Sequence, residues 1–107
     1  MNTPPVILAI AGSDPSGGAG IQADIKTVSA LGGYAAAAVT AITVQNTRGV
    51  AQVEYLSPET VGRQCGAVIE DLSPDAVKIG MTGTPAIISA IAEVLERYGC
   101  RNVVFDP

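Results

Sequence analysis

The sequence predicts an α/β fold in which a mostly parallel β-sheet is covered by helices on both faces. Short apolar runs, typical of buried strands, alternate with segments whose apolar residues recur at helical spacing. Hydrophobic residues make up 48% of the 107 positions and charged residues 15%, a balance typical of a buried core and unlike a disordered chain. The length suits a single domain over residues 1–107.

A buried strand and an amphipathic helix are predicted to open the chain. Residues 6–11 form a short apolar run that ends at Gly12, as expected of a strand buried on both faces. A helix is expected from Gly20 until Gly32 and Gly33 end it. Its inner face is predicted to consist of Ile21, Ile25, Val28 and Leu31.

Two further strands and a second helix are predicted next. Residues 35–44 form a second apolar strand, and residues 50–56 include a short one. Ser57 and Pro58 are typical of a helix start, with a capping hydroxyl and a proline in the first turn. The buried stripe of that helix is predicted to be Val61, Cys65, Val68, Ile69 and Leu72.

The last third repeats the alternation of strand and helix. Residues 76–80 are predicted to be a core strand and residues 103–105 the next strand, which stops at Asp106 and Pro107. Between them, Thr84 and Pro85 indicate a capped helix start, and Gly99 ends the helix. The inner face of this third helix is expected to be Ile88, Ile91, Leu95 and Tyr98.

Charge and cysteine content narrow the class of function. Six basic and ten acidic residues give a formal charge of -4, which disfavours nucleic acid as a partner. The apolar runs are too short for a bilayer span and the amino terminus lacks a secretory signal, so no membrane partner and a cytoplasmic location are expected. Cys65 and Cys100 lack metal-ligand spacing, and the chain has no histidine. Both are expected to be reduced thiols, with Cys65 in the core.

Ligands of parallel α/β sheets bind beyond the carboxyl ends of the strands. Four residues follow predicted strands and are candidates on that ground: Gly12, Gln45, Met81 and Asp106.

The glycine-rich loop of residues 12–20 admits two interpretations. Its glycines permit close approach of a ligand to the backbone, so the loop could cradle one. Alternatively it is a tight turn, with Asp14 and Ser16 as turn or capping residues. The loop matches neither the Walker A pattern nor the dinucleotide-binding pattern of glycines. Asp24, beside the apolar stripe of the first helix, either accepts hydrogen bonds from a polar heterocycle or sits favourably near a helix amino terminus.

The other strand-end residues also have alternative roles. The Gln45 amide offers a donor and an acceptor to the edge of an aminopyrimidine, or caps loop backbone. Met81 either packs on a flat ring or fills the core. Asp106 either orients magnesium or a phosphoryl group, or belongs to a turn.

Three segments resemble one family over nearly the whole chain. They are residues 11–24 (AGSDPSGGAGIQAD), residues 40–50 (TAITVQNTRGV) and residues 78–81 (KIGM). They resemble the hydroxymethylpyrimidine/phosphomethylpyrimidine kinases of thiamine biosynthesis. That resemblance implies a ribokinase-like fold, ATP with Mg²⁺, and two successive phosphorylations, of 4-amino-5-hydroxymethyl-2-methylpyrimidine and then of its monophosphate.

The resemblance also implies roles for individual residues. Gly12, Asp24 and Gln45 would contact the pyrimidine, with the Val44 backbone nearby and Met81 packed on the ring. Asp106 would face the nucleotide phosphates.

Members of the resembled family are more than twice as long as this chain. The remainder carries their glycine-rich anion hole, their catalytic residue and most of their ATP site, so the resemblance implies a catalytic residue beyond Pro107. The chain is therefore expected to be the amino-terminal part of a truncated ribokinase-like domain, inactive and prone to self-association alone, and part of a homo-oligomer at full length. Two alternatives stay open, a pyridoxine-type vitamin kinase and a non-catalytic pyrimidine-sensing module.

Overall fold

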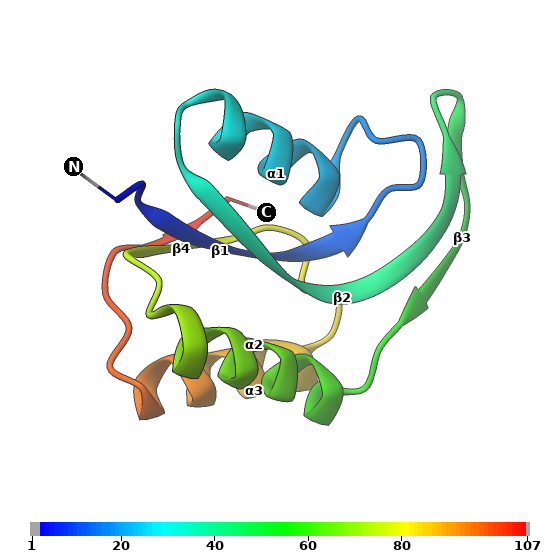
Figure 1. Ribbon diagram of the computed structural model, residues 1–107. Helices are drawn as coiled ribbons and strands as arrows, with labels where there is room; N and C mark the ends of the chain where they lie inside the picture. Colours follow the sequence, from blue (N-terminus) through cyan, green and yellow to red (C-terminus); the bar gives the residue numbers. More distant parts are fainter. Residues whose placement is uncertain (1–2, 107) are drawn as a thin grey trace.

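The computed structural model describes residues 3–106 as a five-stranded sheet with helices on both faces (Figure 1). The strand order is β3-β2-β1-β4-β5, and every neighbouring pair is parallel except β2 with β3. Helix α1 covers one face, while α2 and α3 lie together on the other. The predicted fold class is therefore confirmed. The elements are β1 (Val6–Ser13), α1 (Gly20–Ala30), β2 (Tyr34–Asn46), β3 (Gly49–Tyr55), α2 (Pro58–Leu72), β4 (Ala76–Ile79), α3 (Pro85–Arg97) and β5 (Val103–Phe105).

The core lies between the sheet and the α2–α3 layer. Alternation along β1 directs Leu8 and Ile10 into this layer, where both are fully buried. Ala9 and Ala11 alternate with them and are also buried, on the face that α1 covers. Burying one leucine or isoleucine side chain stabilises a fold by about 1.5–3 kcal/mol, so β1 is the strand that the core depends on most.

Helices α2 and α3 begin where their capping residues predict. The Ser57 hydroxyl accepts a hydrogen bond from the Thr60 N–H at 3.1 Å, and the Thr84 hydroxyl accepts one from the Ile87 N–H at 3.1 Å. A proline follows each cap. Within α2, the most deeply buried residues all belong to the predicted stripe: Val61, Cys65 and Ile69.

The buried stripe of α3 differs from the prediction. Ile91 and Leu95 are buried as expected, but Ile88 is 45% and Tyr98 37% exposed. Both stripes satisfy helical spacing, and the packing against α2 selects the one that includes Ile87 and Val94. Tyr98 follows the helix as its cap and donates a hydrogen bond from its hydroxyl to Glu70 on α2.

Helix α1 is less buried than its sequence predicts. Only Ile21 of its expected inner face is buried, Ile25 is exposed, and Leu31 is 83% exposed. The helix ends at Ala30, just before Gly32 adopts a positive φ of 89°. Leu31 therefore stands beyond the last helical turn, away from the sheet.

The strands that flank the site run further than predicted. Strand β1 continues through Gly12 to Ser13, and β2 continues through Gln45 to Asn46. The extension of β2 pairs with β3, an antiparallel strand that is exposed along its whole length. Strand β5 is present as predicted but is also exposed. Within residues 3–106, the helices are too short or too polar to cross a membrane.

The two cysteines should differ in reactivity. Burial raises the pKa of the Cys65 thiol to about 11, with a smaller contribution from Cys100, and the thiolate is the reactive form. Cys65 is fully buried, whereas Cys100 is partly exposed. We expect iodoacetamide at neutral pH to modify Cys100 first, and Cys65 only after unfolding in urea. Peptide mass spectrometry over time measures both rates, and equal rates in the folded protein would contradict the buried position of Cys65.

Candidate functional site

The loop between β1 and α1 is organised around the Asp14 carboxylate. This side chain is only 3% exposed. It accepts hydrogen bonds from the Ser16 hydroxyl at 2.7 Å and from three backbone N–H groups, those of Ser16 at 2.8 Å, Gly18 at 3.0 Å and Ala19 at 2.8 Å. Asp14 therefore serves as the turn and capping residue that one interpretation of the sequence predicts.

These hydrogen bonds favour the charged form of Asp14. The Ser16 hydroxyl is the largest cause that lowers the pKa of the carboxyl below its ordinary value, and the N–H groups of Ser16, Gly18 and Ala19 lower it further. Burial acts in the opposite direction but is outweighed. The loop thus holds an ionised carboxylate at neutral pH.

Two residues of α1 also fix the loop. Gln22 accepts a hydrogen bond from the Asp14 N–H at 2.8 Å and donates one from its amide nitrogen to the Ser13 hydroxyl at 2.8 Å. The Lys26 ammonium donates to the Gly17 carbonyl at 2.8 Å. Sequence reasoning missed both residues. The available signal was the placement of long polar side chains in the first two turns after a glycine-rich loop.

A hollow of about 200 Å³ lies where β1, β2, β3 and the loop after β4 meet. It brings together Gly12, Gln45 and Met81, three of the residues that sequence analysis selected. The full lining is Gly12, Ser13, Asp14, Ala19, Gly20, Thr43, Gln45, Val50, Val53 and Met81. Apolar groups and a few polar ones around a concave space are typical of small-molecule sites.

Glycine at position 12 leaves room for the Met81 side chain beside the hollow. A Cβ atom there would overlap the terminal methyl group of Met81. The Met81 backbone is fixed in turn, because the Thr40 hydroxyl donates to its carbonyl oxygen at 2.7 Å. Met81 itself is partly exposed, as a side chain that can pack on a ring must be.

Glycine is required at position 20. Its φ is +59°, and a Cβ atom there would overlap the Gly12 carbonyl oxygen. Ser13 and Gly20 additionally form an isolated antiparallel bridge. The two ends of the loop therefore touch through their backbones, and this contact closes one side of the hollow.

Gln45 reaches the hollow beside Thr43. The Thr43 hydroxyl lies 2.8 Å from the Oε1 position of Gln45 and 2.7 Å from the Ser13 carbonyl oxygen. Thr43 is nearly buried and Gln45 half-buried. Both line the hollow, so an amide group with defined neighbours faces any molecule bound there.

Asp24 lies outside the hollow lining and pairs with a lysine. Its two carboxylate oxygens are 2.9 and 3.2 Å from the Lys78 ammonium on β4. Asp24 follows Gly20 by four residues, so it lies one helical turn from the hollow. The electrostatic partner that its position demands is therefore Lys78, a residue 54 positions away.

Val44 and Asp106 are not brought into the hollow. The Val44 side chain is exposed, and it alternates along β2 with Thr43, which lines the hollow. Asp106 is exposed, and its N–H donates to the Ile79 carbonyl at 2.8 Å, which extends the pairing of β4 with β5.

Pro107 lies outside the described residues, which end at Asp106. The turn that sequence analysis assigns to Asp106 and Pro107 is therefore described only for its first residue. The expectation that the catalytic residue lies beyond Pro107 concerns positions that this chain does not contain, and it stays a prediction.

Between residues 3 and 106, no group of three or more histidine, cysteine or acidic side chains is placed to hold a metal ion. Asp106 is a single carboxylate, and Mg²⁺ is usually held by one or two carboxylates together with substrate phosphates and water.

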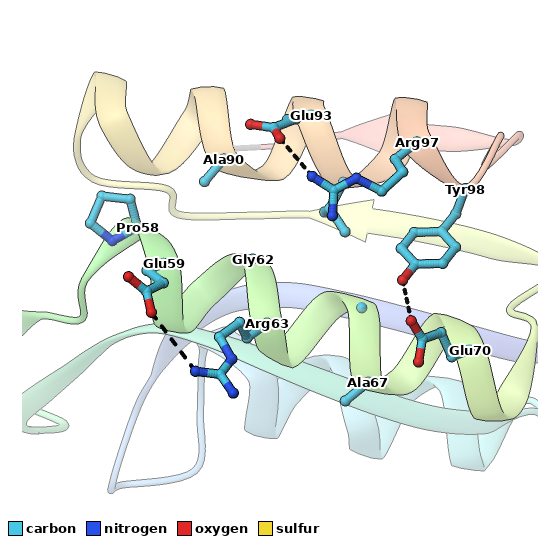
Figure 2. Close-up of a pocket in the computed structure, with 12 residues that line it drawn as sticks. Pro58, Glu59, Gly62, Arg63, Ala67, Glu70, Ala90, Glu93, Arg97 and Tyr98 are labelled. Atoms are coloured by element: carbon cyan, nitrogen blue, oxygen red, sulfur yellow. Dashed lines mark hydrogen bonds and ion pairs between the residues drawn. The ribbon is translucent and has the colours of Figure 1, made fainter.

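A larger groove of about 580 Å³ runs between α2 and α3 on the outer side of the helical layer (Figure 2). Four of its charged side chains pair along the two helices, Glu59 with Arg63 at 3.8 Å and Glu93 with Arg97 at 2.6 Å, and a fifth, Glu70, accepts a hydrogen bond from Tyr98. Exposed pairs of this kind contribute little stability. The smaller hollow is the better candidate because it lies at strand ends and joins groups from separate segments.

Comparisons with known proteins identify relatives of this chain. The family model for phosphomethylpyrimidine kinase matches residues 14–107. A hydroxymethylpyrimidine/phosphomethylpyrimidine kinase from Rhizobium meliloti is 59% identical over 102 residues, which cover 95% of this chain and 38% of that protein. The chain thus spans well under half the length of this curated relative.

Solved structures of vitamin kinases share the fold. A phosphomethylpyrimidine kinase from Clostridium difficile matches with a TM-score of 0.92 and 53% identity, covering 96% of this chain and 45% of that one. A pyridoxal kinase from Staphylococcus aureus, solved with AMP-PCP and pyridoxal, matches with a TM-score of 0.86 and 37% identity, covering 99% and 40%. These matches confirm the predicted ribokinase-like class.

Replacing Gly20 by alanine should disrupt the loop. The left-handed backbone conformation alone costs an alanine about 1–2 kcal/mol, and the overlap with the Gly12 carbonyl adds to this cost. We expect Gly20→Ala to lower the melting temperature measured by circular dichroism. Gly49→Ala is the matched control, since a Cβ atom there meets nothing within 4 Å. Equal melting temperatures for the two variants would contradict the close contact.

The contribution of Asp14 to stability should depend on pH. Because its pKa is lower in the folded than in the unfolded chain, the stabilisation is complete above the ordinary value of 3.8 and is lost as the pH falls through the folded value. Asp14→Asn should therefore melt at a lower temperature than the parent at pH 7, and this difference should shrink below pH 3.8. A difference that stays constant across this range would show that the carboxylate charge is not what stabilises the loop.

Proposed function

Because the chain belongs to the phosphomethylpyrimidine kinase family, we propose that it forms the pyrimidine-binding part of a kinase. The proposed reaction transfers a phosphoryl group from ATP to the hydroxymethyl oxygen of 4-amino-5-hydroxymethyl-2-methylpyrimidine, and then a second one to the monophosphate. The observation that carries the proposal is the meeting of Gly12, Gln45 and Met81 around one hollow.

Each lining group has a suitable role for a flat, nitrogen-rich ring. The bare backbone at Gly12 lets the ring approach closely, and the Met81 thioether supplies a soft apolar surface for one face. Val50 and Val53 of β3 add apolar walls. The Gln45 amide presents both a donor and an acceptor to the edge of the ring, which itself carries an amino group beside a ring nitrogen.

Asp24 and Val44 have supporting roles in the proposal. Asp24 is held by Lys78 one turn beyond the hollow, and a bound ring with an outward-facing donor would reach its carboxylate. The side chain of Val44 points away from the neighbouring lining residues, so its part is confined to backbone groups.

Phosphoryl transfer depends mainly on positioning and on electrostatic stabilisation of the transferred group. In the proposal, the residues that line the hollow supply the positioning, because they hold the ring and so fix its hydroxymethyl oxygen. Asp106, at the end of β5, is assigned to the side from which the nucleotide phosphates approach. ATP with Mg²⁺ would be held mainly by residues outside this chain, and the catalytic residue would lie beyond Pro107, so the chain by itself is proposed to be inactive.

A pyridoxal-type kinase is the second candidate, favoured by the close structural match to the pyridoxal kinase from Staphylococcus aureus. Pyridoxal also carries a hydroxymethyl group on a six-membered nitrogen ring. The higher identity to the pyrimidine kinases supports the first candidate. A pyrimidine sensor without catalysis is a third possibility, which predicts ligand-induced stabilisation without phosphoryl transfer.

A chimaera would test these alternatives. In it, this chain replaces the corresponding segment of the Rhizobium meliloti kinase, to which it is 59% identical. We expect ATP-dependent phosphorylation of the hydroxymethylpyrimidine with a higher kcat/KM than for pyridoxine. A preference for pyridoxine would support the second candidate, and binding without turnover would support the sensor.

Matched variants of the chimaera would place the ring in the hollow. Gly12→Ala should displace the Met81 methyl group and raise KM for the pyrimidine, with little loss of stability because that methyl group ends a flexible side chain. Ile88→Ala, on the exposed face of α3, is the control and should leave KM unchanged. An unchanged KM in Gly12→Ala would contradict the assignment of the hollow.

A further inference from the structure

The Thr43 hydroxyl has two oxygen neighbours but only one hydrogen. It is 8% exposed and lies 2.7 Å from the Ser13 carbonyl oxygen and 2.8 Å from the Oε1 position of Gln45. A hydroxyl donates one hydrogen bond and accepts others. It can therefore donate a hydrogen bond to only one of these two neighbours. In its contact with the other, the hydroxyl oxygen has to accept a hydrogen bond.

The Ser13 carbonyl decides which neighbour receives the hydrogen. A carbonyl oxygen can only accept, so Thr43 donates to Ser13. The remaining contact then requires a donor on Gln45. The nitrogen and oxygen of a side-chain amide exchange places when the group turns over, and the hydrogen-bond network determines which arrangement is present. In the arrangement that satisfies all three groups, the Gln45 amide nitrogen donates to Thr43.

This arrangement fixes what Gln45 offers to the hollow. One N–H of the amide is used by Thr43, so the second N–H and both lone pairs of the carbonyl oxygen remain. The Gln45 amide therefore presents its carbonyl acceptor and its N–H donor to the hollow in a defined order. In one orientation of the ring, a 4-aminopyrimidine presents the complementary order on its edge, an amino donor beside a ring-nitrogen acceptor. In the same orientation, its deaminated 4-oxo analogue presents the reverse order, a carbonyl acceptor beside a ring N–H.

We propose that Thr43 is a positioning residue that holds the Gln45 amide in the orientation selecting a ring with an amino group over its 4-oxo counterpart. The inference rests on the proposed function, because it assumes that the ring binds in this hollow. Thr43 is well placed for the task. Its hydroxyl is anchored to Ser13, where the register between β1 and β2 shifts, so it is tied to the sheet and not to a free loop.

Two substitutions in the chimaera described above would test the role. Thr43→Val keeps the shape of the side chain but removes the hydroxyl, and Thr43→Ser keeps the hydroxyl. We expect Thr43→Val to raise KM for the aminopyrimidine by about two- to tenfold, the range of one hydrogen bond, with kcat nearly unchanged. The preference for the amino over the 4-oxo ring should narrow by a similar factor, and Thr43→Ser should retain the parental preference.

The outcomes separate this inference from the proposed function. If the parent chimaera phosphorylates the aminopyrimidine, the proposed function stands whatever Thr43 does. If Thr43→Val folds and discriminates as the parent does, or if Thr43→Ser folds and loses discrimination, the positioning role is wrong.

A spectroscopic measurement tests the orientation without any activity. In NMR spectra of the ligand-free chimaera, the two Gln45 amide protons should differ, one showing a nuclear Overhauser effect to Thr43 and slower exchange with water. Thr43→Ser should keep this signature. If neither amide proton is close to residue 43 in the parent, the inference is overturned, even where Thr43→Val fails to fold.

Discussion

The hollow depends on the direct contact between the two ends of the loop of residues 12–20. The Gly20 backbone lies against the Gly12 carbonyl so closely that no side chain fits at position 20. This contact joins the end of β1 to the start of α1. Since β1 is the most deeply buried strand, the core fixes where the loop begins, and the hydrogen bonds to Asp14 fix its shape. Met81 and Gln45 complete the lining of a hollow in which the positions of Gly12 and Gly20 are already fixed.

The Asp14 carboxylate supports this contact from inside the loop. Its two oxygens already accept hydrogen bonds from Ser16, Gly18 and Ala19. The carboxylate is therefore engaged within the loop and does not serve as a ligand-binding group. A glycine-rich loop with an acidic residue is easily interpreted as a site in which that residue binds something. Here the acidic residue shapes the site from within its lining, and the other lining groups are backbone, an amide, hydroxyls and apolar side chains.

Local rules predicted several features of the structure, although helical spacing failed to predict the inner face of α1. The order of strands and helices, the caps at Ser57 and Thr84, and the burial of Cys65 all follow from residues close together in the chain. The α3 stripe could not be decided in this way, since two sets of apolar residues fit one helical period and only packing against α2 distinguishes them.

For the candidate site, the sequence predicted residues at strand ends but not the partners that hold them. Strand ends pointed to Gly12, Gln45 and Met81, which the structure brings together. The partners that fix side chains within the site were missed, because pairing is a property of the folded chain. Lys78 meets Asp24 across 54 positions, and the Thr43 hydroxyl meets Ser13 across 30. Nothing in the spacing of either residue indicates its partner.

The position of β3 has a consequence for how tightly the hollow can hold a molecule. Val50 and Val53 belong to this strand, which is exposed throughout and, in the part of the chain that the structure describes, pairs only with β2 (Figure 1). Within residues 3–106, this part of the lining thus belongs to a two-stranded ribbon, while Gly12 belongs to the buried strand β1. Such a ribbon opens locally at lower free energy than the core. A molecule that contacts both β3 and Gly12 has to order this ribbon, and the entropic cost of that ordering lowers its affinity.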